Sequence, residues 1–336
     1  MISFIWPRPA DNFLSGIGGS ESYTIGQTRE LNARGIKAQI VTLKGGNDVD
    51  LTAIPGVPFL PLTKEEIAEL ETPVFVLEPQ VIKTKHPSYV ILHCPPPPVE
   101  RGEHEFYLEG VKGRKIIVSS RYASKLWASD LGVDEKEIGI AYPFADEAFA
   151  RQPRLKSHGK KTRVLFASRL HPDKGIYTFL AALHFTYILP QDSFEFHVVT
   201  AASDTPEGKV IESMLRAHPY LTLHPPAKGP AKVAEMMSEY DIILMPSNAQ
   251  FYHETFGMNS VEAQHAGCRV VASRDGGLVE TDCGGVTFVE PDNPYELARG
   301  IAKAASLPPL TVAERKRAAA MYTVGQSVDQ LLHILK

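Results

Sequence analysis

The 336-residue sequence contains only three cysteines, Cys94, Cys268 and Cys283, and they lie far apart. An odd number of scattered cysteines argues against a disulfide framework and supplies no cysteine pair for a structural zinc site. Proteins without disulfides are typical of reducing compartments, so we expect this chain in the cytoplasm.

Long hydrophobic runs and a strong net charge are also missing. No stretch approaches the roughly 18 consecutive apolar residues of a membrane-spanning helix. The apolar residues 1–7 are few and lack a basic leader, so we expect a first buried strand there, not a signal peptide. The formal net charge of −4 gives no reason to expect binding to nucleic acid or wholesale binding to membranes.

A complete dinucleotide-binding fingerprint is absent as well. Residues 16–21 read Gly-Ile-Gly-Gly-Ser-Glu, so Glu21 stands where Gly-x-Gly-x-x-Gly requires its third glycine. A helix is nevertheless expected from about Ser20 to Arg34. Gly18 and Gly19 would let the backbone approach a ligand closely at a helix start that favours anions. A tight turn between a strand and a helix is the alternative interpretation.

The sequence does contain a regular alternation of strand and helix patterns, which predicts an α/β protein with parallel sheets covered by helices. Its length suits two domains, and 43% hydrophobic residues suit a globular chain. Residues 151–161 are polar and basic, as in a linker, and separate domains expected at 1–150 and 151–310. Strands are expected at residues 2–6, 38–43, 74–77, 89–93, 115–119, 138–141, 163–168, 194–200, 221–224, 241–246 and 269–273.

The most informative block is residues 254–263, Glu-Thr-Phe-Gly-Met-Asn-Ser-Val-Glu-Ala. A helix is expected after Thr255, which places Glu254 in the preceding loop and Glu262 roughly 12 Å along the helix. The helix start at Phe256, Gly257 and Met258 would offer free N–H groups to a phosphate. This layout suits a nucleotide-sugar, with the sugar at Glu254, the diphosphate at the helix start and the ribose at Glu262. An ordinary strand–loop–helix is the alternative.

Two cations follow an earlier strand. Arg169 and Lys174 both lie between the end of the strand at 163–168 and a helix expected near Gly175. Ligands of open α/β sheets bind at the carboxyl ends of strands. A guanidinium and an ammonium at this place can neutralise a diphosphate leaving group, although two solvated surface cations are the alternative.

These motifs resemble those of retaining GT-B glycosyltransferases, specifically glycosyltransferase family 4. The block from Glu254 to Glu262 resembles the Glu-x7-Glu signature of that family. Residues 168–175 resemble its Gly-Arg-Leu-x-x-x-Lys-Gly element, with Ser168 in place of the first glycine. Residues 276–280 resemble its Gly-Gly-x-x-Glu, and the likeness extends over 18–35 and most of 138–304.

The resemblance implies two facing Rossmann-like domains with the active site in the cleft between them, and C-terminal helices at 311–336 that cross back to the first domain. It implies that Gly18 and Gly19 face the donor phosphate and that a histidine of the first domain lies near the sugar. His93 is the candidate, with His86 and His104 as weaker rivals. The proline run at 95–98 departs from the family pattern, which leaves the acceptor side open.

The expected activity is the transfer of a hexose from a UDP-sugar to a hydroxyl acceptor with retention, without a metal or other cofactor. Asp48 and Asp50 form an Asp-x-Asp triplet, but in a glycine-rich loop where an exposed turn is the better interpretation. The acceptor is a glycan, a lipid-linked glycan or a small molecule, and peripheral attachment to the inner face of the membrane stays open. Two alternatives remain, a GT-B nucleotide-sugar epimerase and a non-catalytic sugar-binding homologue.

Overall fold

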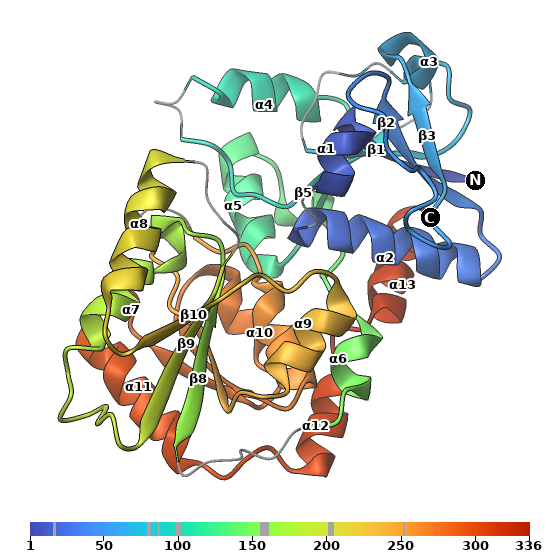
Figure 1. Cartoon of the computed structure of the whole chain (residues 1–336). Coiled ribbons are helices and arrows are strands. Elements are labelled where there is room, and N and C mark those ends of the chain that lie inside the picture. The colour runs from blue at the N-terminus through green and yellow to red at the C-terminus, as the bar shows by residue number, and fades with distance from the viewer. Residues whose placement is uncertain are drawn as a thin grey trace. The chain divides into compact units, whose positions relative to one another are not determined.

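The computed structural model describes residues 1–15, 18–78, 82, 84–85, 88–98, 102–154, 161–200, 205–250 and 253–336. The chain divides into two compact units (Figure 1). One consists of Met1–Phe144 together with Val324–Lys336, and the other of Ala145–Thr323. Each unit contains one parallel sheet with helices packed against it, as the alternation of patterns predicts.

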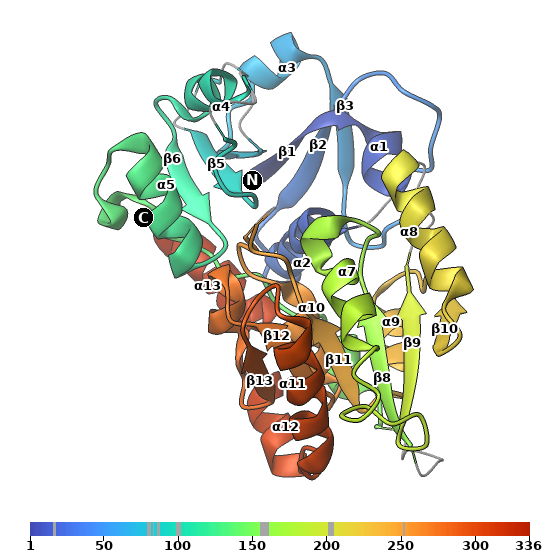
Figure 2. The same cartoon turned by 90° about the vertical axis from the view of Figure 1, so that its left-hand side faces the viewer.

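The first unit is built on a seven-stranded sheet in the order β3-β2-β1-β4-β5-β6-β7. Figure 2 shows several of these strands side by side. The order runs outward in both directions from β1 and β4, as in a Rossmann fold. The strands are β1 (Ile2–Pro9), β2 (Ala38–Leu43), β3 (Phe59–Leu62), β4 (Val74–Leu77), β5 (Ser88–Leu92), β6 (Lys115–Val118) and β7 (Gly139–Ile140). The helices are α1 (Ala10–Ser15), α2 (Gly19–Ala33), α3 (Lys64–Ala68), α4 (His104–Val111), α5 (Arg121–Leu131) and α13 (Val324–Ile334).

Both faces of this sheet are buried at its centre, which explains why β4 is apolar and buried at every position. Phe4 of β1 belongs to a cluster with residues of α2 and α13, whereas the neighbouring Ile5 packs with Ile67 of α3. Helix α13 is tied to this unit by polar contacts too, since Gln27 Nε2 donates to Ser327 Oγ at 2.9 Å. Lys115 Nζ donates to the carbonyl of Ile334 at 2.8 Å.

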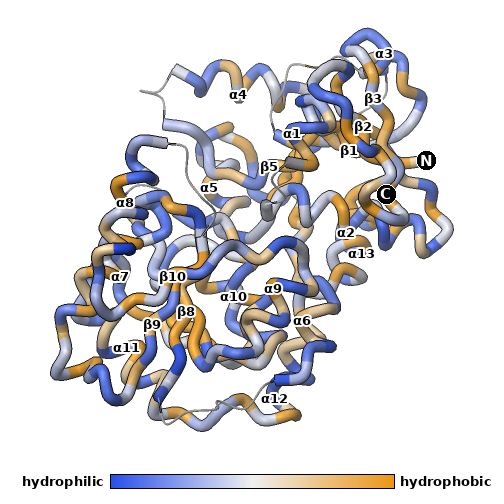
Figure 3. The backbone as a smooth tube through the Cα atoms, viewed as in Figure 1, coloured by the Kyte–Doolittle hydropathy of each residue, from blue (hydrophilic) through white to orange (hydrophobic). Residues whose placement is uncertain are grey.

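The second unit repeats the same topology with six strands, in the order β10-β9-β8-β11-β12-β13. The strands β8 and β9 are hydrophobic over much of their length (Figure 3). The strands are β8 (Thr162–Ala167), β9 (Phe194–Val199), β10 (Leu221–His224), β11 (Ile242–Met245), β12 (Arg269–Ser273) and β13 (Val286–Val289). The helices are α6 (Glu147–Arg151), α7 (Ile176–Ala182), α8 (Pro206–Ala217), α9 (Pro230–Met237), α10 (Met258–His265), α11 (Pro294–Ser306) and α12 (Val312–Ala319).

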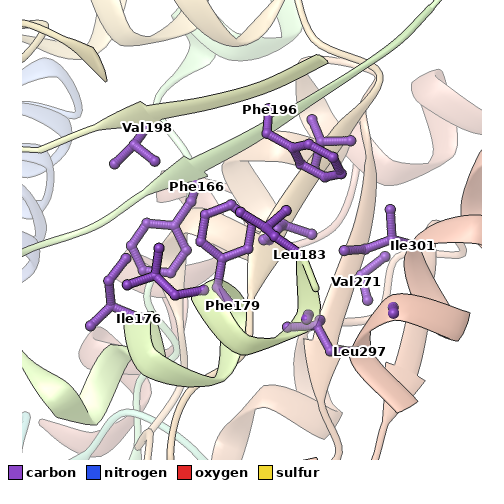
Figure 4. Close-up of a cluster of buried hydrophobic side chains, with 14 of the residues drawn as sticks. Phe166, Ile176, Phe179, Leu183, Phe196, Val198, Val271, Leu297 and Ile301 are labelled. Carbon is purple, nitrogen blue, oxygen red and sulfur yellow. The ribbon is translucent and has the colours of Figure 1, made fainter. Parts of the chain in front are cut away.

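An aromatic and aliphatic core holds α7 and α11 against this sheet (Figure 4). The rings of Phe166 on β8 and Phe179 on α7 stack with centroids 5.5 Å apart. Burying a side chain of this size contributes about 1.5–3 kcal/mol. The expectation of two Rossmann-like halves with parallel sheets is therefore confirmed. None of the helices within the described ranges combines the length and the apolar character needed to cross a bilayer.

Candidate active site

The strand order of the second sheet identifies the carboxyl ends of β8 and β11 as the place for a ligand. The chain moves outward from β8 to β9 and β10, then returns to the other side of β8 at β11. Loops that leave neighbouring strands at such a reversal diverge to opposite faces of the sheet and leave a crevice at the carboxyl ends. Here those loops follow β8 and β11, and they carry Arg169, Lys174 and Glu254.

Lys174 and Glu254 meet directly at this edge. Lys174 Nζ lies 2.5 Å from Glu254 Oε1, and the hydroxyl of Ser247 donates to the same oxygen at 3.2 Å. The side chains of Lys174 and Glu254 are only 14% and 13% exposed. A buried ion pair adds little net stability, because each charge loses its hydration. The pair places a cation and a carboxylate side by side, where a polar ligand could bond to both.

The turn that presents Lys174 is fixed by its neighbours. A short 3-10 helix, Pro172–Lys174, ends at Gly175, which has a left-handed φ of 71°. A Cβ atom at Gly175 would lie 1.7 Å from the carbonyl oxygen of Pro246, so only glycine fits. The carbonyl of Asp173 accepts the N–H of Asn248 at 2.8 Å. The loops after β8 and β11 are therefore joined by backbone contacts.

Arg169 lies at the same edge but in a different environment. Its side chain is exposed, and it forms no ion pair with any residue that the structure describes. A planar guanidinium in this state can bind two oxygens of an incoming phosphate at once. Arg169 and Lys174 thus share the carboxyl end of β8 as the motif predicts, one exposed and the other already paired.

The helix that follows Glu254 begins later than the sequence pattern predicts. Helix α10 starts at Met258, and Gly257 before it has a left-handed φ of 97°. The expectation of helix directly after Thr255 is therefore wrong, because this conformation at Gly257 interrupts a right-handed helix. Phe256 is buried against the ring of Tyr322 with centroids 5.1 Å apart. The estimate of roughly 12 Å of helix between the two glutamates no longer applies.

Asn259 fixes the start of α10 relative to the sheet. Its Nδ2 donates to the carbonyl oxygen of Ala167, the last residue of β8, at 2.8 Å. The first N–H groups of an α-helix have no partner within the helix, and they carry a partial positive charge. The contact therefore holds the N-terminal turn of α10 against the end of the strand that leads to Arg169 and Lys174.

Glu262 lies one turn further along α10 and is partly buried. Burial raises the pKa of its carboxyl group from 4.5 to about 7, and the negative charge of Asp146 adds to this effect. At neutral pH the group is thus close to half protonated. A carboxyl group in this state accepts hydrogen bonds and, when protonated, also donates one.

In the first unit, the predicted glycines lie at the start of α2. Gly18 precedes the helix and Gly19 is its first residue, while Gly16 and Ile17 lie outside the described residues. The N–H of Gly18 donates to Glu21 Oε2 at 3.0 Å. The residue that breaks the dinucleotide fingerprint thus supplies a carboxylate to this helix start. An incoming anion would have to displace it.

His93 follows β5, as expected. Burial lowers the pKa of its imidazole to about 4, so the ring is neutral at pH 7. It packs edge-on against Tyr23 with centroids 4.8 Å apart. Of its rivals, His104 bonds to Asp130 at 2.9 Å, and His86 lies outside the described residues. A neutral imidazole can accept or donate a hydrogen bond but supplies no charge.

The Asp-x-Asp triplet lies in an exposed segment after β2. Asp50 accepts hydrogen bonds from both the N–H and the hydroxyl of Thr52, at 2.8 and 2.6 Å. This is the arrangement of an Asx turn. Within the described ranges, no three His, Cys, Asp or Glu residues are grouped closely enough to hold a metal ion.

Three polar residues at the site were not predicted from the sequence. Ser247 bonds to Glu254, Asp173 is buried beside Lys174, and Asp275 bonds to His253. The position of Ser247 directly after a buried strand was a usable signal. Asp173 has its side-chain partners, His171 and Lys174, in its own turn, but no sequence signal singled it out. No signal identified Asp275, because its partner His253 lies in a different loop.

Comparison with known families gives a match over part of the chain. Residues 161–306 match the family model described as glycosyl transferases group 1. A D-inositol 3-phosphate glycosyltransferase of Arthrobacter is 28% identical over 242 residues, which cover 68% of this chain and 56% of the relative. A lipopolysaccharide 1,2-N-acetylglucosaminetransferase of Salmonella typhimurium is 28% identical over 185 residues, which cover 52% of this chain and 47% of that protein. The chain thus spans about half the length of these relatives.

Solved structures share the whole fold at low identity. A glycosyltransferase from Rickettsia africae superposes with a TM-score of 0.78 at 17% identity, over 100% of this chain and 98% of the other. Sucrose-phosphate synthase from Thermosynechococcus elongatus gives 0.75 at 18% identity, over 99% and 98%. Anabaena HepE in complex with UDP-glucose gives 0.72 at 16%, over 99% and 98%. The chain therefore has the GT-B type of α/β fold, and the match to the glycosyl transferases group 1 model lies within its second unit.

Proposed function

We propose that this protein is a retaining glycosyltransferase that moves a hexose from a nucleotide-sugar to a hydroxyl acceptor without a metal ion. The observation that carries the proposal is the contact between Lys174 and Glu254 at the strand-order reversal of a glycosyl transferases group 1 domain. A cation and a carboxylate at one point suit a substrate that has a diphosphate next to a ring of hydroxyl groups.

The donor half of the reaction is assigned to the second unit. Arg169, Lys174 and the N–H groups around Phe256, Gly257 and Met258 take up the negative charge that develops on the leaving diphosphate. In this proposal these groups replace a divalent cation. Glu254 accepts hydrogen bonds from sugar hydroxyls and positions the anomeric carbon.

Glu262 is assigned to the ribose of the donor. Its carboxyl group accepts from the ribose hydroxyls when charged, and it also donates when protonated. UDP is the nucleotide we propose, and the support is that structural neighbours of the same fold were solved with UDP and with UDP-glucose. Those neighbours are 16% identical to this chain, so the base and the sugar are proposals drawn from fold likeness.

The acceptor half is assigned to the first unit. His93, neutral at pH 7, would bond to a hydroxyl of the sugar, and Gly18 and Gly19 would approach the donor phosphate. In a retaining reaction of this kind the acceptor hydroxyl attacks from the face of the leaving group, and a departing phosphate oxygen takes its proton. The acceptor is proposed to be a glycan, lipid-linked glycan or small molecule, reached in the cytoplasm or at the inner membrane face.

Release of nucleoside diphosphate tests the proposal. UDP-glucose, GDP-mannose, ADP-glucose and TDP-glucose are incubated with EDTA and a panel of hydroxyl acceptors. We expect acceptor-dependent release of one nucleotide and a product with the anomeric configuration of the donor. Conversion of one nucleotide-sugar into another would indicate an epimerase, and binding without release a non-catalytic homologue.

Lys174→Ala is the matching variant, and we expect it to lower turnover about 100-fold or more, as for loss of one charge-stabilising donor. The control is Lys232→Ala, which removes an exposed lysine paired with Glu235 in the same unit. Equal activity of both variants would mean that the diphosphate is held elsewhere.

A further inference from the structure

The segment that carries Glu254 runs beside a segment that follows the next strand of the sheet. Residues 253–255 precede α10, and residues 275–277 follow β12. The N–H of Gly277 donates to the carbonyl oxygen of Glu254 at 2.7 Å. A Cβ atom at Gly276 would lie 2.4 Å from that same oxygen, and one at Gly277 would lie 2.0 Å from the carbonyl of Thr255. The two backbones are therefore as close as glycine allows.

A side-chain contact joins the same two segments. Nδ1 of His253 lies 2.8 and 2.9 Å from the two carboxylate oxygens of Asp275. Asp275 is only 14% exposed and His253 is 46% exposed. A carboxylate can only accept hydrogen bonds, so Nδ1 of His253 must carry the proton in this contact. In the neutral ring, Nε2 is then the acceptor. The ring next to Glu254 therefore has one orientation and one tautomer when neutral.

Asp275 bonds to His253 in place of capping the 3-10 helix that it precedes. It precedes the 3-10 helix Gly276–Thr281, at the position where an aspartate commonly accepts an N–H of the helix. Its side chain makes no such capping bond with the described residues of that helix. The carboxylate is turned toward His253 instead. A second carboxylate, Asp292, follows β13 and acts electrostatically on both residues, and burial raises its pKa.

Glu254 is consequently held from three directions. Its carboxylate bonds to Lys174 and Ser247, its carbonyl oxygen bonds to Gly277, and the residue before it is held by Asp275. Nothing in the motif Glu-x7-Glu requires the last of these contacts. We propose that His253 and Asp275 form a positioning pair that sets the direction of the Glu254 carboxylate toward the transferred sugar. This inference rests on the proposed function, in which Glu254 contacts sugar hydroxyls.

Two isosteric variants separate positioning from direct contact with a ligand. In His253→Asn the amide nitrogen lies about where Nδ1 was, so the bond to Asp275 is kept. In His253→Gln the amide reaches about as far as Nε2 and the bond to Asp275 is lost. His184→Ala, which removes an exposed histidine elsewhere in the same unit, is the control.

The measured quantity is the ratio of the affinity for a nucleotide-sugar to the affinity for the free nucleoside diphosphate. Isothermal titration measures the Kd of each free nucleoside diphosphate and of UDP-glucose, GDP-mannose, ADP-glucose and TDP-glucose, and the donor that binds most tightly is used. We expect His253→Gln to lower the affinity ratio between nucleotide-sugar and free nucleotide about tenfold, the size of one lost hydrogen bond. The free nucleotide should bind within about twofold of wild type, and His253→Asn should retain the ratio.

A double-variant cycle with Glu254→Gln completes the test. If His253 acts through Glu254, adding His253→Gln to Glu254→Gln causes no further loss, because interacting residues are not additive. The positioning role alone would be overturned if the two substitutions lowered the affinity ratio independently, so that their effects multiplied. It would also be overturned if His253→Asn lowered the ratio more than His253→Gln. Full sugar-dependent affinity in Glu254→Gln would overturn the assignment of Glu254 in the proposed function, and the positioning role with it.

Discussion

At the scale of single residues, Glu262 has an environment that disfavours its charged form. Burial and the charge of Asp146 raise the pKa of its carboxyl group to about 7 in the folded protein, from 4.5. An acid with a raised folded pKa stays protonated longer in the native state than in the unfolded state. The free energy of unfolding therefore falls as the pH rises from about 4.5 to about 7, and it stays lowered above that range.

Glu262→Gln removes this titration. We expect the variant and the wild type to be about equally stable near pH 4.5, and the variant to be more stable by about 1–3 kcal/mol at pH 8. Urea unfolding at both pH values measures the difference, with the exposed Glu71→Gln as the control. If Glu262 binds the ribose, the same variant should also bind the nucleotide more weakly at pH 8. A constant stability difference across this range would contradict the raised pKa.

Single residues also show what the sequence alone can predict of the site. Glu254, Lys174 and Arg169 were predicted because each stands at a fixed distance from a glycine or a strand end. The contact between Lys174 and Glu254 was not predicted, because the residues are 80 positions apart and meet only when β8 and β11 pair. The hydrogen bond from the N–H of Gly18 to the carboxylate of Glu21 was not predicted either, because a glycine pattern indicates only the backbone conformation.

At the scale of secondary-structure elements, apolar strands were predicted well because both sheets are buried on both faces. The strands β2, β4, β10 and β12 have the predicted bounds. The edge strands β3 and β13 were missed. The first contains Pro61, which cannot donate to a ladder and is tolerated in a strand at the edge of a sheet. The second has only two buried residues, Thr287 and Val289, so its pattern lacks the apolar run of a central strand.

The turn between β8 and α7 gives a prediction at this scale. In Gly175→Ala the new methyl group would collide with the carbonyl of Pro246 in addition to adopting a left-handed φ. We expect the free energy of unfolding to fall by more than about 2 kcal/mol, a loss typical of strain at a special backbone position.

Gly132→Ala is the matched control for that variant. Gly132 has φ and ψ of 65° and 32°, close to the 71° and 26° of Gly175, but no atom of the residues that the structure describes lies within 4 Å of the place that its new methyl group would take. It should lose only about 1 kcal/mol. Chemical denaturation compares the two variants, and equal losses would show that the approach of Pro246 does not constrain the turn.

At the scale of the whole molecule, the two units repeat one topology but differ in the groups at their strand ends. Each sheet extends outward in both directions from a central pair, β1 and β4 in one and β8 and β11 in the other. Alternating strands and helices predict this architecture, because parallel strands need crossover connections. The pattern of residues 324–334 predicts a helix, whereas only the family resemblance implied that the C-terminal residues pack against the first unit, because packing partners far along the chain leave no periodic signal.

Nucleotide binding without metal tests the central claim most directly. Thermal shifts are measured with UDP, GDP, ADP, TDP and their common sugars in the presence of EDTA. We expect one nucleotide to stabilise the protein, by about 2.7 kcal/mol at a hundred times its Kd, and Lys174→Ala to lose most of that shift. The absence of any shift, with EDTA or with added Mg²⁺ or Mn²⁺, would contradict a nucleotide-sugar site at the carboxyl ends of β8 and β11.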